Sequence, residues 1–552
     1  MHTYTKRIIA RCVLFVGILQ SCQSPDGKLT VPDTESLCQP NTNNDPSPVV
    51  SDPAAEVSPL ALWLSRQYPT LDAQALGVQP MSHLESLLDA YEAAQTGAGA
   101  CAGLRQPSRS GEGSTPAMLP ADGLTPLHRA ARDGDLDAVT SLTAGRVDLD
   151  VLSSQGITAL GLAAQNNHLD IARYLHGKGA SLQQIAANGY GPVYLAAYEG
   201  HLPMVQFICE SEKDIDLEAD NPAGVTPLWV SARNGHVQVM EYLHKRGAKL
   251  EVRDPSNRTP VYVASENGHL PVVEYLCEQN VSLDTVSRND FTPLEAAAKE
   301  GYLDIVTYLC TNGAPLEAVS GEIGGITALY IAAHNGHLEV VKYLHVRGAN
   351  IEAIDNLFGF SPLYVAAQND HLPVVQYLHG AGANLAYTTP EKYTPLHAAA
   401  RNNRLGVVQY LCEQDEVDIE ALDKLESTPL SIAAYEGCLE VVQWLCQKGA
   451  RIESQDDEGL TPLCMAAHNG HLLVVEYLLQ QGAKLAAVDG SGWTPLHSAI
   501  QNDHFEVVKC LCEHGAPLSS EGDLGSPLVF AKDCDSPNER IIKYLKDLEA
   551  LA

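Results

Sequence analysis

Small and apolar residues recur in one pattern, about 33 residues long, from residue 125 to the end of the chain. Each copy opens with Thr-Pro-Leu or a close variant and continues with small residues, mostly Ala, as in 125–134 and 394–403. Thr followed by Pro predicts a helix start, because the Thr side chain can cap a free amide and Pro has a helical φ. The Ala residues let neighbouring helices approach closely. We therefore predict a short, closely packed helix in each copy.

The residue nine positions after the Thr is always Gly, Asn or Asp, the types that tolerate a left-handed backbone at a helix end. These residues are Gly134, Asn167, Gly200, Gly235, Gly268, Gly301, Gly336, Asp370, Asn403, Gly437, Gly470, Asp503 and Asp535. A second helix is expected next, with Pro or an acidic residue in its first turn and Val-Val-x-Tyr-Leu as its buried stripe. Gly-Ala closes this helix, and about ten extended residues, called a finger below, lead to the next copy.

The repeat resembles the ankyrin repeat, whose length and T-P-L-H-x-A core it shares. The Thr position is occupied, in chain order, by Thr125, Thr158, Gly191, Thr226, Thr259, Thr292, Thr327, Ser361, Thr394, Thr428, Thr461, Thr494 and Ser526. The resemblance implies an all-α repeat solenoid over residues 122–552, in which thirteen helix-turn-helix units with extended β-turn fingers stack into a curved, right-handed-twisting rod. The last repeat ends in a charged helix, as a capping repeat that faces water requires.

The N-terminus has the pattern of an export signal. Lys6 and Arg7 precede an apolar run of eight residues, 12–19, which is too short to span a bilayer as a mature helix. The sequence Leu-Gln-Ser-Cys at 19–22 is similar to the bacterial lipobox. This resemblance implies a signal peptide over 1–21, a lipidated Cys22, and an outer-membrane lipoprotein that faces the periplasm or the surface. Secretion after ordinary cleavage and an uncleaved anchor are the alternatives.

Three segments separate the signal from the repeats. Residues 22–58 are rich in Pro, Asn, Ser and Asp, a composition typical of a disordered tether. Residues 59–96 have helical periodicity and a capping box, which predicts a small helical segment. Residues 97–121 form a linker rich in Gly, Ser and Pro.

The charge narrows the choice of partners. Acidic residues outnumber basic ones 68 to 35, for a net charge of −33. Such a surface repels phosphate backbones and anionic lipids, so nucleic acid is excluded as a partner and membrane attachment is expected only through the N-terminus. We expect a monomer.

The 20 His and 14 Cys invite a catalytic or metal-binding interpretation, but their spacing opposes it. His201, His236 and His269 occupy one repeat position, and layers about 10 Å apart cannot converge on one zinc ion. We expect these His to bond backbone between helices. Cys209, Cys277 and Cys310 form a similar series and are expected to be free thiols, because disulfides need Cα atoms within about 7 Å. Catalytic motifs are missing, and we predict no enzyme activity, cofactor or metal site.

The resemblance implies a protein-binding scaffold that uses finger tips and the exposed ends of the first helices on the concave side. Host proteins are among the candidate partners, since such arrays are common in symbionts and pathogens. The bulky or cationic residues at these positions are the candidate binding residues: Phe291, Ile323, Ile326, Phe358, Phe360, Tyr393, Arg132, Arg233 and Arg401. The competing interpretation is that the aromatics pack between fingers. An enzyme or metal protein that uses the His and Cys series, and a passive spacer, are the alternative functions.

Overall fold

The computed structural model describes residues 124–551 except 155, 184–189, 213, 220–223, 289–290, 319–324, 519–525 and 535–536. Contacts divide the chain between Pro116 and Ala117, and every described residue belongs to the second unit. The signal peptide, Cys22 and the segments predicted up to residue 121 lie outside the described residues, as does Ile323. No helix in the described ranges has the length and apolar character needed to cross a membrane.

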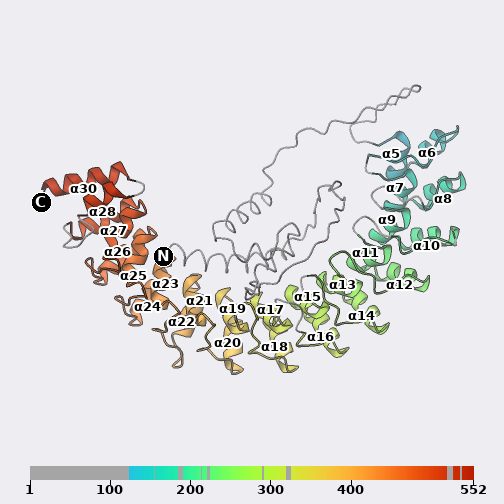
Figure 1. The fold of residues 1–552 in the computed structure, drawn as a ribbon. Coiled ribbons are helices and arrows are strands. Elements are labelled where there is room, and N and C mark those ends of the chain that lie inside the picture. The colour runs from blue at the N-terminus through green and yellow to red at the C-terminus, as the bar shows by residue number, and fades with distance from the viewer. Residues whose placement is uncertain are drawn as a thin grey trace, which may run out of the picture. The chain divides into compact units, whose positions relative to one another are not determined.

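The described residues fold into pairs of antiparallel helices in regular succession (Figure 1). The first helices of the pairs are α5 (Pro126–Asp133), α7 (Ala159–Gln165), α9 (Pro192–Tyr198), α11 (Pro227–Arg233), α13 (Pro260–Glu266), α15 (Pro293–Glu300), α17 (Ala328–His334), α19 (Pro362–Gln368), α21 (Pro395–Arg401), α23 (Pro429–Tyr435), α25 (Pro462–His468), α27 (Pro495–Gln501) and α29 (Pro527–Asp533). The second helices are α6 (Leu136–Leu142), α8 (Leu169–Gly177), α10 (Leu202–Ser211), α12 (Val237–Lys245), α14 (Leu270–Glu278), α16 (Leu303–Thr311), α18 (Leu338–Val346), α20 (Leu372–Gly380), α22 (Leu405–Leu411), α24 (Leu439–Gln447), α26 (Leu472–Gln480), α28 (Phe505–Glu513) and α30 (Glu539–Leu551).

The ends of the first helices follow the sequence pattern. Thr226 has an extended backbone, and its hydroxyl accepts a hydrogen bond from the amide of Trp229. All twelve described residues nine positions after the Thr position have φ between 57° and 81°, which confirms the left-handed helix ends. Asp535, the thirteenth, lies outside the described residues.

The helices of successive repeats pack in two rows. Within the repeat unit, the first helices lie along the inner side of an arc and the second helices along its outer side (Figure 1). Small side chains such as Ala163 and Ala197 are fully buried between first helices, while residues such as Val341 and Leu344 fill the space behind them. Burial of this apolar surface between neighbours is the main source of stability in such an array.

Adjacent fingers are joined by backbone hydrogen bonds. The amide of Lys424 donates to the carbonyl of Glu391 at 2.9 Å, and the amide of Gly490 donates to Glu458 at 2.7 Å. Carboxylates at the finger bases extend this pairing, as where Glu251 accepts a bond from the amide of Ser282 at 2.8 Å. These bonds hold the fingers that make them in place against their neighbours.

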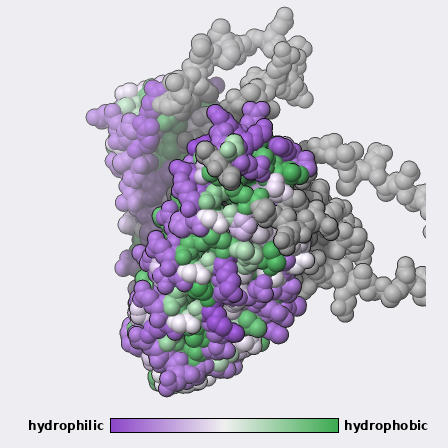
Figure 2. Space-filling view, turned by 90° about the vertical axis from the view of Figure 1, so that its left-hand side faces the viewer, coloured by the Kyte–Doolittle hydropathy of each residue, from purple (hydrophilic) through white to green (hydrophobic). Residues whose placement is uncertain are grey.

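The array ends in a polar cap. Helix α30 buries Ile541 and Leu545 against the preceding repeat and exposes its charged residues Glu539 and Lys543. The guanidinium carbon of Arg540 lies 3.6 Å from the centre of the Phe505 ring. Seen from the side of these C-terminal helices, apolar side chains form separate patches among polar ones (Figure 2).

Candidate binding surface

A row of His side chains ties many of the described repeats to the one before. The Nε2 atom of His236 donates to the carbonyl of Tyr198 at 3.0 Å, and His337 donates to Lys299 at 2.8 Å. Equivalent bonds are made by His168, His201, His371, His471 and His504. The prediction that this His series bonds backbone is confirmed. These bonds fix a carbonyl of the preceding repeat, two residues before its left-handed helix end.

The left-handed glycines accommodate these imidazoles as well as the backbone turn. A Cβ atom on Gly301, which has φ of +81°, would lie 2.5 Å from Nδ1 of His337. Where the His is replaced by Arg404, its Nε donates to the carbonyl of Gln368 at 2.9 Å, so the link between repeats is kept. The bonds of the His series and of Arg404 therefore anchor the backbone of the inner surface in the repeats that make them.

The Cys and His side chains on the second helices do not gather around a common centre among the described residues. All ten Cys in the described part of the chain are free, and burial raises the pKa of Cys209, Cys277 and Cys310 to about 11. Nδ1 of His244 lies 2.8 Å from the hydroxyl of Tyr275 in the next repeat. No group of three His, Cys, Asp or Glu that could hold a metal ion occurs among the described residues.

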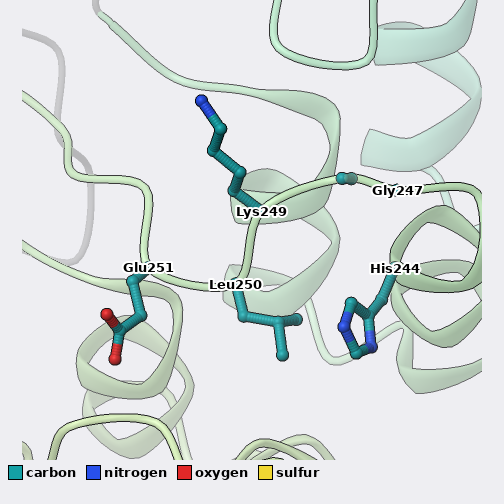
Figure 3. A pocket seen from close by; sticks show the side chains of 6 residues that line it. His244, Gly247, Lys249, Leu250 and Glu251 are labelled. Carbon is teal, nitrogen blue, oxygen red and sulfur yellow. The ribbon is translucent and has the colours of Figure 1, made fainter.

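A shallow depression of about 530 Å³ lies beside His244 and the start of the following finger (Figure 3). The side chains of Lys249 and Glu251 extend to opposite sides of it, and Leu250 lies between them along the chain. The depression therefore does not bring the Lys249 and Glu251 side chains together.

Two of the aromatic residues predicted as surface anchors are buried. Phe291 is 5% exposed and Phe360 is 8% exposed, so the expectation that they face solvent was wrong. Phe360 stacks on Tyr364 at 4.4 Å and on Phe358 at 5.2 Å between ring centres, which turns it onto its own first helix. Packing against apolar neighbours therefore stabilises these rings more than exposure to water would.

The other apolar candidates are half-buried. Phe358 and Ile326 are both of intermediate exposure, and the Tyr393 ring packs edge-on against His397 at 5.6 Å. The backbone of Phe358 is fixed because Asp355 accepts a hydrogen bond from its amide at 2.6 Å. These half-buried side chains therefore do not form a fully exposed patch.

Asp355 also explains a departure from the repeat pattern. Tyr330 stands where the motif has His, and its hydroxyl donates to the Asp355 carboxylate at 3.3 Å. Burial raises the pKa of Asp355, although bonds from the Phe358 and Phe360 amides oppose this effect. The bond that the motif His would make is thus remade by a buried Tyr and Asp.

The three candidate Arg residues differ in their partners. Arg132 pairs with Asp133 at 2.7 Å, and this bond lowers the pKa of the Asp133 carboxyl. Arg401 pairs with Glu436 of the next repeat at 3.2 Å. Arg233 is exposed and makes no ion pair with any described residue. Of the three, Arg233 is the one whose charge is available to a partner.

The structure adds one residue that the sequence-based selection omitted. Tyr198 is 42% exposed and is the only aromatic among the exposed large apolar side chains of the described residues. It ends helix α9 as Arg233 ends helix α11, one repeat later. Its place two residues before a left-handed helix end was the signal that could have found it.

Comparison with known proteins gives the family. A model of ankyrin repeats in three copies matches six overlapping segments: 93–186, 179–254, 246–320, 317–389, 379–456 and 430–521. Among solved structures, the crystal structure of the human ASB11 ankyrin repeat domain is 26% identical, with 41% of this chain and 99% of that chain covered and a TM-score of 0.38. No curated protein matches. Ankyrin repeats are generally protein–protein interaction modules and are typically non-catalytic. This chain belongs to the ankyrin-repeat family.

Proposed function

We propose that this protein is a non-catalytic scaffold that binds a partner protein on the inner, finger-bearing side of the array. The observation that carries the proposal is the exposed pair Tyr198 and Arg233, at equivalent positions of consecutive repeats. Tyr and Arg are enriched among the few interface residues that carry most of the binding energy. Successive first helices lie about 10 Å apart, so one partner segment can contact both side chains.

The backbone beneath this pair is preorganised. The carbonyl of Tyr198 accepts hydrogen bonds from His236 Nε2 at 3.0 Å and from Asn234 Nδ2 at 2.8 Å. Both donors belong to the repeat that holds Arg233, so the two positions are tied together. A fixed backbone loses little conformational freedom when a partner binds, which favours affinity.

The charge of Arg233 suits a contact with an acidic or polar group. Arg233 makes no ion pair with any described residue, so its guanidinium can pair with a carboxylate of a partner. An ion pair formed with a partner would be partly desolvated at the interface and stronger than an exposed pair within the chain.

Site-specific photo-cross-linking tests the proposal. A photoreactive phenylalanine analogue replaces Tyr198 in one variant of the full chain and Val346 in another. Val346 is exposed at the end of α18, on the outer row of helices. We expect a defined protein adduct from position 198 and none from position 346.

The proposal fails if both positions give the same adducts or if position 198 gives none. The second outcome would favour a passive spacer. An enzyme or metal protein built on the His and Cys series would instead require a convergent polar group, and no metal-binding group is present among the described residues.

We also propose, from the N-terminal sequence alone, that the scaffold is exported and held at a membrane surface by a lipid on Cys22. The basic residues Lys6 and Arg7, the short apolar run and the residues 19–22 support this proposal. Mass spectrometry of the mature N-terminus tests it. A diacylglycerol-modified Cys22 is expected, and an unmodified Cys22 would refute the attachment.

A further inference from the structure

Two fingers near the middle of the array meet through a pair of hydrogen bonds. The finger 246–258 contributes the carbonyl of Ser256, which accepts a bond from the amide of Arg288 at 2.8 Å. It also contributes Asn257, whose Nδ2 donates to the carbonyl of Val286 at 2.6 Å. Arg288 and Val286 belong to the next finger, 279–291. These two bonds join the fingers, and the residues that make them are called the junction below.

Two exposed guanidinium groups belong to this junction. The Arg253 side chain donates to Oδ1 of Asn257 at 3.1 Å, which places it beside the residue that joins the fingers. Arg288 is exposed on the other finger. Neither residue makes an ion pair with any described residue.

Three acidic side chains on or next to the first of these fingers have partners within the chain. Asp254 and Glu266 pair with Arg258 at 2.8 and 3.5 Å, and Arg258 also lies over the Trp229 ring. Glu251 accepts a bond from the amide of Ser282. No described carboxylate forms an ion pair with Arg253 or Arg288, although the chain as a whole is strongly acidic.

The equivalent junction later in the array, between the fingers that hold Glu391 and Lys424, has a carboxylate that the Arg288 junction does not have. Lys424 stands where Arg288 stands, and its amide donates to Glu391 as that of Arg288 donates to Ser256. There, Lys424 Nζ also pairs with the Glu391 carboxylate at 3.1 Å. Ser256 replaces this Glu and cannot neutralise Arg288. The replacement of this Glu by Ser256 therefore leaves Arg288 without the ion pair that Lys424 has.

We propose that the Arg253–Arg288 finger junction binds carboxylates in an acidic segment of the partner protein. Guanidinium groups bind carboxylates through paired, charge-assisted hydrogen bonds. The junction fixes the side chain of Arg253 and the backbone of Arg288. This inference rests on the proposed scaffold function and names the chemistry of the partner. The site is distinct from Tyr198 and Arg233, so each can be tested without the other.

The probe is a fluorescein-labelled peptide of eight glutamates, titrated into the full chain at low salt, with an eight-lysine peptide for comparison. We expect the acidic peptide to bind in a salt-sensitive manner. The double variant Arg253→Gln with Arg288→Gln should weaken this binding about tenfold or more, a change that one or two charge-assisted bonds can account for.

Two further variants make the test specific to the junction. Ser256→Glu supplies the carboxylate found at the later junction and should also weaken binding of the acidic peptide. Glu391→Ser removes that carboxylate from Lys424 and should strengthen it. The control variant Arg146→Gln with Lys484→Gln removes two exposed cations elsewhere and should change the affinity less than twofold.

The inference is overturned if the acidic peptide does not bind, or if the control variant weakens binding as much as the junction variants do. Cross-linking from position 198 together with no binding of the acidic peptide would leave the scaffold function intact and refute this site alone. Binding of the acidic peptide at the junction without cross-linking from position 198 would support this site and refute the binding surface at Tyr198 and Arg233.

Discussion

His397 provides a sensitive test of how the repeats are packed, because its imidazole is 0% exposed and both nitrogens are engaged. Nδ1 accepts a hydrogen bond from the amide of Thr394 at 3.2 Å, and Nε2 donates to the carbonyl of Ser427 at 3.2 Å. A proton on Nδ1 would face the donating Thr394 amide and would reverse the bond with the Thr394 hydroxyl, which lies 2.8 Å from Nδ1. Burial accordingly lowers the pKa of His397 from 6.5 to about 4.

The perturbation is a fall in pH from 6.5 to 4. The unfolded chain binds a proton at His397 near pH 6.5, whereas the folded chain does so only near pH 4. The stability that this residue contributes is therefore fully present above pH 6.5 and is lost as the pH falls toward 4. At about 1.36 kcal/mol per pH unit, the interval corresponds to roughly 3 kcal/mol.

Histidine hydrogen exchange at the imidazole carbon, resolved by peptide mass spectrometry, measures this pKa directly in the native protein. Amide exchange of residues 394–411 should accelerate between pH 6.5 and 4. The variant His397→Ser, which places there the residue that the next repeat has at Ser431, should lose most of this acceleration. A native pKa of 6 or above for His397, or an unchanged pH dependence in the variant, would refute the packing argument.

Three further predictions follow from other contacts. Gly301→Ala should lower the free energy of unfolding by about 1–3 kcal/mol more than Gly313→Ala, because both have positive φ but only Gly301 meets an imidazole; urea unfolding followed by circular dichroism compares them. The Cys209 thiol, with its pKa raised to about 11, should resist iodoacetamide at pH 8 until the repeats unfold, and rapid native labelling would contradict its burial. Tyr330→Phe removes the buried donor to Asp355 and should cost about 0.5–1.5 kcal/mol, so an unchanged urea midpoint would argue against that bond.

The fold could be predicted because each repeat determines its structure locally. The Thr226 side chain caps the helix that follows it, and Gly235 nine residues on tolerates the left-handed backbone that ends this helix. The bonds from His236 and its equivalents join neighbouring layers, so the same local pattern also fixes the stacking.

The candidate binding surface was less predictable because it depends on contacts between residues far apart in the sequence. The sequence places Phe360 on a finger, but it does not show that the Phe360 ring packs on Tyr364 and away from solvent. Arg401 and Arg233 occupy the same repeat position, but a Glu 35 residues later neutralises only Arg401. Such partners are visible only when the repeats are stacked.

The affinity of the cross-linked partner for variants of the full chain tests the central claim most directly. Tyr198→Ala with Arg233→Ala should weaken binding about 30-fold or more, as loss of interface residues worth about 2 kcal/mol requires. The control Val346→Ala with Lys543→Ala, which alters exposed residues on the outer row and the terminal cap, should bind as the unmodified chain does. Equal affinities for the two double variants would contradict a binding surface on the inner side of the array.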